Sequence, residues 1–224
     1  MPTLPVADAY VFDIDGTLLV TKDLVHWNAL HQAMIETYGV NTSIEGIPYD
    51  GKTDLSILRA ALAREGISDS EFDAKLSVAL PVVCREVELN HRQIHPKVCP
   101  GIVQLLESLK MNQKLIGVAS GNLETVGWHK IEAAGLRKFF TFGCFSDRHE
   151  SRAEIFRNAL EFVTAQLGAG ARACFIGDTP SDIEAARQVG AQILAVASGT
   201  FSFAELNACS PDFCVSHCGE FFPE

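Results

Sequence analysis

The sequence is short of basic residues. It has 18 Lys and Arg against 28 Asp and Glu, which gives a formal net charge of -10 at pH 7. Proteins that bind the phosphate backbone of nucleic acids need clustered basic side chains, and here the basic residues form only short groups such as Arg148, His149 and Arg152. We therefore expect no nucleic acid partner. A small anionic ligand stays compatible with this charge, because a few local charges and a metal ion can override the global field.

Long hydrophobic runs are missing as well. No segment approaches the ~20 apolar residues that span a bilayer, and residues 1–8 lack the basic and apolar stretches of a signal peptide. The seven cysteines include no C-x-x-C pair, and the three nearest the C-terminus, with His217, fit no standard zinc spacing. We expect a reduced, cytoplasmic protein with no membrane partner, and the sequence does not predict its oligomeric state.

Four short apolar runs, each followed by polar or glycine-rich residues, predict buried strands. They cover residues 9–12, 115–119, 173–176 and 193–196, and weaker candidates lie at 139–142 and 213–215. Continuous apolar runs of this length are typical of strands that are buried on both faces, as in a parallel sheet. Helical patterns lie between them, at 102–109, 153–167 and 181–189.

The alternation of strands and helices predicts an α/β fold, a doubly wound, Rossmann-like parallel sheet with right-handed crossovers. In such sheets ligands bind at the carboxyl ends of the strands. The polar residues that follow the four strong runs are therefore expected to meet at one place.

The stretch 21–95 differs, since it contains no convincing strand. Amphipathic helices are predicted at 24–38 and 55–65, and one or two more over 70–90. We interpret residues 21–95 as a helical cap domain inserted after the first strand. The catalytic core would then consist of residues 1–20 and 96–224.

The clearest chemical motif is Phe12-Asp13-Ile14-Asp15-Gly16-Thr17-Leu18. Two carboxylates separated by one residue can face the same pocket if the chain leaves its extended form, and Gly16 permits that departure. One carboxylate of such a pair can attack phosphorus while the other moves a proton to or from the leaving oxygen. The alternative interpretation is an ordinary aspartate-rich turn at a strand end.

This D-x-D-G-T-L motif resembles that of the haloacid dehalogenase (HAD) superfamily, and the helical insertion resembles the branch that includes phosphoglycolate phosphatase and β-phosphoglucomutase. The resemblance covers nearly the whole chain. It implies a Mg²⁺-dependent phosphatase that hydrolyses a small phosphorylated metabolite. Asp13 would be the nucleophile that forms an aspartyl-phosphate, and Asp15 the general acid and then the general base.

By the same resemblance, Ser120, Gly121 and Asn122 match a motif that binds the transferring phosphoryl group, where donors must meet developing charge. The stretch 177–182 resembles the last motif of the family. Asp178 is accordingly expected to bind magnesium together with the carboxylate of Asp13 and the backbone carbonyl of Asp15, since Mg²⁺ prefers oxygen ligands.

Asp182 has two interpretations that the sequence leaves open. It either supports the metal site from behind the direct ligands, or it caps the helix that follows, and one carboxylate can do both.

The third motif departs from the family, where a lysine is usual. In the stretch 146–156 the register places Arg152 at the lysine position, and Arg148 is the competing candidate. Arginine can neutralise the aspartyl and phosphoryl charges, although its planar fork differs from an ammonium group.

Residues of the predicted cap carry weaker signals. The segment 50–54 resembles a substrate-specificity loop, in which Lys52 would contact the anionic substrate and Thr53 would help to close the loop. The alternative is a solvated turn in which Thr53 caps the next helix. His26 is interpreted as structural and is left out of the catalytic set, because a lone helix histidine is more often structural.

Two other functions stay open. A phosphomutase would share the first half-reaction and would transfer the phosphoryl group to a sugar instead of water. A non-catalytic HAD-like binding module is the second alternative, because a fold alone does not establish activity.

Overall fold

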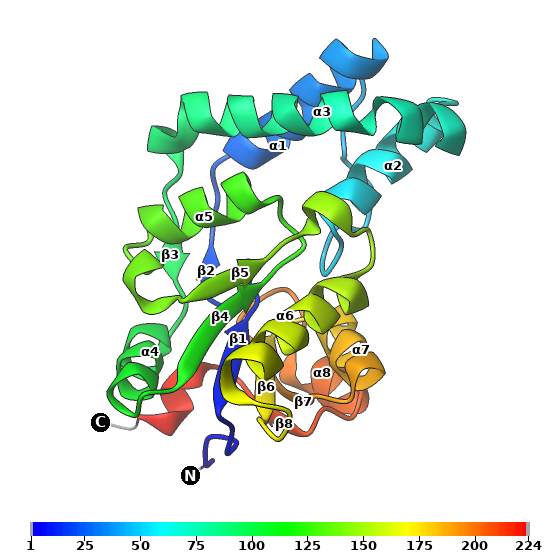
Figure 1. Ribbon diagram of the computed structural model, residues 1–224. Coiled ribbons are helices and arrows are strands. Elements are labelled where there is room, and N and C mark those ends of the chain that lie inside the picture. Colours follow the sequence, from blue (N-terminus) through cyan, green and yellow to red (C-terminus); the bar gives the residue numbers. More distant parts are fainter. Residues whose placement is uncertain (1, 223–224) are drawn as a thin grey trace.

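A six-stranded parallel sheet forms the centre of the computed structural model, which describes residues 2–222 (Figure 1). The strand order is β5-β4-β1-β6-β7-β8. The strands are β1 (Ala9–Phe12), β4 (Leu115–Ala119), β5 (Phe142–Cys144), β6 (Ala173–Gly177), β7 (Gln192–Val196) and β8 (Phe213–Val215). All five neighbouring pairs are parallel. The predicted fold class is confirmed.

Helices cover both faces of this sheet, as the apolar strands require. The side chains of β1 alternate between two hydrophobic clusters, Tyr10 and Phe12 in one, Ala9 and Val11 in the other. The first face is covered by α4 (Ile102–Met111) and the C-terminal part of α5 (Glu124–Ala133). The second is covered by α6 (Arg152–Leu167), α7 (Pro180–Val189) and α8 (Phe203–Ala208).

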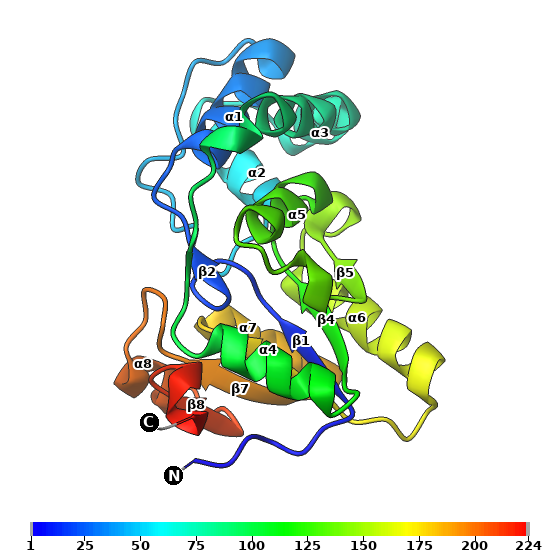
Figure 2. The same ribbon diagram turned by 90° about the vertical axis from the view of Figure 1, so that its left-hand side faces the viewer.

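Three further helices form a separate layer beyond the carboxyl ends of the strands, here named the α1–α3 layer (Figure 2). It contains α1 (Val25–Ala33), which continues as a π-helical turn at Met34–Tyr38, α2 (Asp54–Arg64) and α3 (Asp69–Asn90). Its own hydrophobic cluster includes Leu30, Met34, Leu58, Leu62 and Phe72. The helices predicted at 24–38, 55–65 and 70–90 are confirmed, the last as one helix.

The chain passes between the sheet and the α1–α3 layer through a small antiparallel ribbon. Its strands are β2 (Leu19–Val20) and β3 (Lys97–Val98), which lie next to the predicted boundaries at 20/21 and 95/96. Leu123 and Val126, at the start of α5, are fully buried in the cluster of the α1–α3 layer. Because this cluster joins the two parts, the division into a core and a cap domain stays a prediction.

The strand predicted at 139–142 is misplaced, because β5 begins only at Phe142. Residues Arg137–Phe139 form a short 3-10 turn, and the ring of Phe140 packs edge-on against Phe12 at 6.2 Å between centroids. The segment 139–142 is apolar mainly because the rings of Phe139 and Phe140 are buried. Only its last residue, Phe142, pairs with a neighbouring strand. The helices α5 and α8 were not predicted.

Within residues 2–222, no helix combines the length and apolar character needed to cross a membrane.

Candidate active site

Asp13 follows β1 directly and lies buried at the carboxyl end of the sheet. Its backbone N–H donates to the carbonyl of Ile176 at 2.9 Å, which continues the pairing of β1 with β6. Oδ2 lies 2.6 Å from Nη2 of Arg152, whereas Oδ1 is buried and accepts no hydrogen bond from any described residue. Burial, together with the carboxylates of Asp182 and Asp15, raises the pKa of Asp13 to about 6 against the lowering effect of Arg152.

Arg152 links Asp13 to a second buried carboxylate. Its Nε lies 2.7 Å from Oδ1 of Asp182, so the planar guanidinium bridges two acids at once. Burial lowers the pKa of Arg152, but the two carboxylates outweigh it and leave the pKa above its usual value. Arg148, the competing candidate, is exposed and forms no ion pair among residues 2–222. The structure thus places Arg152, at the register that the sequence predicted, against Asp13.

Asp178 and Asp182 follow β6 and complete the acidic group. Asp178 Oδ1 accepts a hydrogen bond from Thr17 Oγ1 at 2.9 Å. Burial raises the pKa of Asp178 well above its usual value, and the charges of Asp13 and Asp182 add to this. Asp182 Oδ2 accepts from the backbone N–H and the hydroxyl of Thr179, at 3.0 and 2.7 Å, and thereby caps α7. The structure thus shows the capping interpretation of Asp182, and its support of a metal site stays a prediction.

The backbone beside Asp178 leaves no room for side chains. A Cβ on Gly16, which has φ of +82°, would lie 2.1 Å from Oδ2 of Asp178, and one on Gly199 would lie 1.8 Å from the same atom. Glycine at position 16 thus serves two needs, the left-handed backbone of the turn and the close approach of a carboxylate.

The acidic group fits a divalent metal ion. Carboxylate oxygens of Asp13, Asp178 and Asp182 lie within 4.8 Å of one another. Both oxygens of Asp182 are already engaged, so carboxylate oxygens of Asp13 and Asp178 are the available ligands. One guanidinium faces three buried carboxylates, and a hard cation with oxygen ligands would supply the missing positive charge.

We expect a divalent cation to raise the melting temperature of the metal-free protein, and to do so more at pH 7 than at pH 5. Because the folded-state pKa of Asp13 is about 6 against an ordinary 3.8, the folded state holds this proton more tightly. Stability without metal therefore falls as the pH rises from 3.8 to about 6. At an ion concentration of about 100 times Kd, the gain at pH 7 should be about 5–10 °C.

Thermal melts with MgCl₂ or EDTA at both pH values measure this effect. The matched variant Asp178→Asn should lose most of the response to Mg²⁺ while melting no lower than the wild type in EDTA. Identical melting curves for wild-type protein with Mg²⁺ and with EDTA at pH 7 would show that the acidic group holds no ion.

Asp15 points to a different set of polar groups. Its two oxygens lie 2.9 and 2.7 Å from Nζ of Lys130, and Asn122 Nδ2 donates to Oδ2 at 2.8 Å. Desolvation raises the pKa of Asp15, but its side chain is 43% exposed, and the ammonium of Lys130 with the Asn122 hydrogen bond brings the pKa below its usual value.

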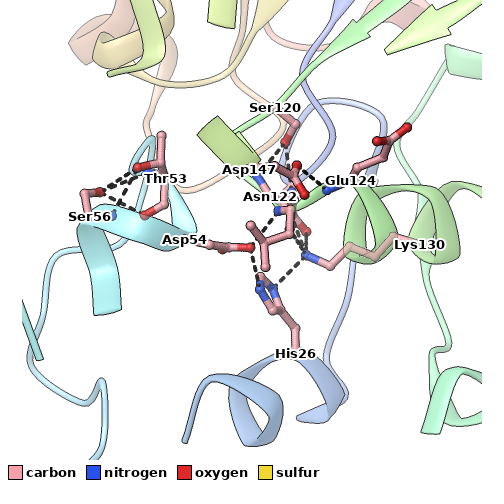
Figure 3. A network of polar contacts seen from close by, with 11 residues as sticks. His26, Thr53, Asp54, Ser56, Ser120, Asn122, Glu124, Lys130 and Asp147 are labelled. Atoms are coloured by element: carbon pink, nitrogen blue, oxygen red, sulfur yellow. Dashed lines mark hydrogen bonds and ion pairs between the residues drawn. The ribbon is translucent and has the colours of Figure 1, made fainter. Parts of the chain in front are cut away.

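The loop after β4 contacts Asp15 and Lys130 through Asn122. Ser120 is buried, and its Oγ accepts a hydrogen bond from Asn122 Nδ2 at 2.8 Å (Figure 3). The carbonyl of Gly121 accepts from the backbone N–H of Asp54 at 2.8 Å, and a Cβ on Gly121 would lie 2.3 Å from the carbonyl oxygen of Lys52. The predicted phosphate-binding loop therefore touches the loop 50–54 of the α1–α3 layer, backbone against backbone.

The two predicted substrate residues of that loop differ in placement. Thr53 is buried, forms a capping box with Ser56 at the start of α2, and donates its hydroxyl to the carbonyl of Glu150 at 2.9 Å. The ammonium of Lys52 is exposed and reaches none of the site carboxylates in the described chain. The structure thus shows the capping interpretation for Thr53, and substrate binding by Lys52 and Thr53 stays a prediction.

Lys130, which contacts Asp15, was missed from the sequence, and His26, which the sequence analysis left out of the catalytic set, lies beside it. His26 lies with Nδ1 3.3 Å from Nζ of Lys130 and with Nε2 3.0 Å from Oδ2 of Asp54 (Figure 3). Lys130 was overlooked because α5 was not predicted. The available signal was a lysine between Val126 and Ile131, on the apolar face of a helix that follows a strand-end loop.

These features define a class of protein, an α/β enzyme whose site is built from buried carboxylates at the strand ends and covered by a helical layer. The chain belongs to the haloacid dehalogenase-like hydrolase family, whose family model matches residues 10–196. The resemblance found in the D-x-D-G-T-L motif is confirmed.

Individual relatives agree with this assignment. A phosphoglycolate phosphatase of Mesorhizobium japonicum is 24% identical over 212 residues, which cover 92% of this chain and 89% of that protein. A phosphoglycolate phosphatase of Caulobacter vibrioides is 27% identical over 195 residues, with 84% and 78% covered. The predicted enzyme class, a hydrolase of the phosphatase type, is confirmed. The crystal structure of CbbY from Rhodobacter sphaeroides in complex with phosphate shares the fold, with a TM-score of 0.71, 16% identity and 97% of both chains covered.

Proposed function

We propose that this protein is a Mg²⁺-dependent phosphatase that hydrolyses a small phosphate monoester through an aspartyl-phosphate on Asp13. The observation that carries the proposal is the free, buried Oδ1 of Asp13, whose partner oxygen is fixed by Arg152. A carboxylate held in this way has one oxygen available for attack. The two phosphoglycolate phosphatase relatives make phosphoglycolate the first substrate to test.

Two half-reactions follow from this placement. In the first, Asp13 Oδ1 forms a bond to phosphorus, the bond from phosphorus to the leaving oxygen breaks, and protonated Asp15 gives its proton to that oxygen. In the second, Asp15 takes a proton from water, the hydroxide bonds to phosphorus, and the carboxylate of Asp13 is released. Arg152 and the donors of the loop 120–122 balance the phosphoryl charge. When bound by Asp13, Asp178 and the carbonyl of Asp15, Mg²⁺ supplies further charge neutralisation.

The α1–α3 layer acts in this proposal as a lid that closes for the first half-reaction, selects a compact leaving group, and then opens to admit the water of the second. Several contacts of the loop 50–54 and of α2 with the segments around the sheet support a closed arrangement. Thr200 Oγ1 donates to Oδ1 of Asp50 at 3.1 Å, and a Cβ on Gly51 would lie 2.6 Å from Oγ1 of Thr179. Arg59 on α2 forms a bidentate ion pair with Glu150, with distances of 2.7 and 2.9 Å.

A cytoplasmic location is part of the proposal. All seven cysteines are free thiols, which persist in a reducing compartment. Burial raises the pKa of Cys174 and of Cys218 to about 12, so these two thiols are poor nucleophiles.

Phosphate release from phosphoglycolate and from p-nitrophenyl phosphate, each with Mg²⁺ and with EDTA, tests the proposal. We expect release with Mg²⁺ and its loss in EDTA, because three buried carboxylates cannot bind a phosphate dianion without added positive charge. Transfer of labelled phosphate to a sugar instead of water would establish the phosphomutase alternative. Failure of folded protein to release phosphate from a broad panel of monoesters would leave the non-catalytic module.

A further inference from the structure

We propose that Lys130 is a positioning residue that aims the carboxyl group of Asp15 at the leaving oxygen, and that His26 makes this alignment depend on closure of the α1–α3 layer. The proposal rests on the phosphatase function proposed above and adds two residues to it. Neither residue belongs to the D-x-D motif or to the acidic group around Asp178.

Lys130 is a buried cation whose donors are directed at the acid. It is 4% exposed, and its Nζ donates to both oxygens of Asp15 at 2.9 and 2.7 Å and to Oδ1 of Asn122 at 2.8 Å. Burying an ammonium group is costly unless it is paired and hydrogen-bonded. Asn122 Nδ2 donates to Oδ2 of the same carboxyl at 2.8 Å. Three hydrogen bonds thus fix the plane of the Asp15 carboxyl group.

A chain of polar contacts connects this arrangement to the α1–α3 layer. Lys130 Nζ lies 3.3 Å from Nδ1 of His26 on α1, and His26 Nε2 lies 3.0 Å from Oδ2 of Asp54 on α2 (Figure 3). Asp54 Oδ2 also accepts from the backbone N–H of Leu123 at 2.8 Å, which ties the chain to the end of the phosphate-binding loop. If the layer moves away, His26 and Asp54 leave with it.

Closure of the α1–α3 layer therefore brings His26 to the ammonium group of Lys130 as a further polar partner. An ammonium group has three protons, and in the closed structure they are shared among Asp15, Asn122 and His26. Without His26 the ammonium loses a partner on the lid side and can turn, and the carboxyl group bound to it can turn as well. The acid is thus aligned when the lid is seated over a substrate.

The contribution of this alignment depends on the leaving group. When the bond from Asp13 to phosphorus forms and the ester bond breaks, an alkoxide leaving group must receive the proton of Asp15. A p-nitrophenolate ion is stable enough to leave without that proton. Hydrolysis of the aspartyl-phosphate, in which Asp15 acts as a base, is common to both substrates, whereas kcat/KM reports only the steps up to release of the leaving group. In kcat/KM, a residue that aligns the acid therefore affects alkyl phosphates and spares aryl phosphates, whereas loss of fold or of phosphoryl binding affects both.

The test compares Lys130→Met and His26→Gln with wild-type enzyme on an alkyl and an aryl substrate, phosphoglycolate (or β-glycerophosphate) and p-nitrophenyl phosphate. For Lys130→Met we expect kcat/KM on the alkyl phosphate to fall about 10²–10³-fold, the usual range for general acid catalysis, with less than about fivefold loss in kcat/KM on the aryl phosphate. His26→Gln should lose about tenfold on the alkyl phosphate alone. Lys138→Met, which removes an exposed lysine, is the matched control and should change neither rate.

Equal losses of kcat/KM on both substrates would overturn the proposal, as would unchanged kcat/KM on the alkyl phosphate. Lys130→Arg keeps a cation at this position and should recover part of the alkyl activity. Should Lys130→Met not fold, Lys130→Arg and His26→Gln still decide the question through the same comparison of substrates. Failure of the phosphatase function itself would be visible separately, since wild-type enzyme would then release phosphate from neither substrate.

Discussion

Replacing Asp13 by asparagine should reduce phosphate release by at least about 10⁴-fold, the order of loss seen when a covalent nucleophile is removed. An amide oxygen cannot form the acyl phosphate, and the ion pair with Arg152 is lost together with the charge. The fold should persist, because the substitution removes one of three clustered buried carboxylates, and burial already disfavours the charged form of Asp13. Steady-state kinetics and a thermal melt in EDTA measure the two effects.

Asp73→Asn is the matched control for this variant. Asp73 is an exposed carboxylate on α3 that pairs with Arg59 at 2.8 Å. Its loss should cost less than about 1 kcal/mol and leave the rate unchanged. Substantial turnover by Asp13→Asn would exclude Asp13 as the nucleophile and with it the aspartyl-phosphate mechanism.

Replacing Arg152 by methionine should lower the free energy of unfolding in EDTA at pH 7 by about 3–5 kcal/mol, the cost of removing one partner of a buried ion pair. The variant leaves Asp13 and Asp182 buried without their cation. The loss should be smaller at pH 5, since the pKa of Asp13 is about 6 and the group is then largely protonated. Urea unfolding at the two pH values measures it.

Arg148→Met is the matched control, because the sequence alone could not decide between the two arginines. Arg148 is exposed, and its replacement should change stability by less than about 0.5 kcal/mol and leave activity intact. Arg152→Lys keeps a charge but loses the planar fork that bridges two carboxylates, so it should retain only part of the activity. A larger effect at Arg148 than at Arg152 would contradict the assignment.

Arg152 stands at a helix position where a basic residue is unfavourable, and its contacts in the site explain why it lies there. It is the first residue of α6, where a cation opposes the helix dipole, and its N-cap Ser151 makes no side-chain capping hydrogen bond. A sequence that breaks a local rule in this way often does so at a functional position. The register of the stretch 146–156 could identify Arg152 as a candidate, but only the fold brings it between Asp13 and Asp182.

The sheet could be predicted from the sequence because its strands are buried on both faces. β1, β4, β6 and β7 are short, continuous apolar runs that end at polar residues, and the rule that ligands bind at the carboxyl ends of parallel strands places those residues together. Asp13, Ser120 and Asp178 follow from this rule. Helix α5 was missed because its buried face includes Gly127 and Lys130, which weaken the apolar pattern.

The surroundings of Asp15 could not be predicted, because they depend on segments that meet only in the folded chain. Asp15 is separated from Lys130 by 115 positions, and Lys130 from His26 by 104. The resemblance placed the loop 50–54 over the site, but it could not give the direction of the Lys52 side chain. Side-chain direction in a loop depends on local backbone geometry, which neither composition nor periodicity determines.

Helix α5 packs into two hydrophobic clusters, and this packing affects how the protein unfolds. Leu123 and Val126 are fully buried among the helices of the α1–α3 layer, whereas Ile131 on the same helix is buried against the sheet. Pulling the layer away would expose apolar side chains whose burial stabilises by about 1.5–3 kcal/mol each. Sheet and layer are therefore expected to melt as one cooperative unit, and each opening of the lid for substrate costs part of this burial.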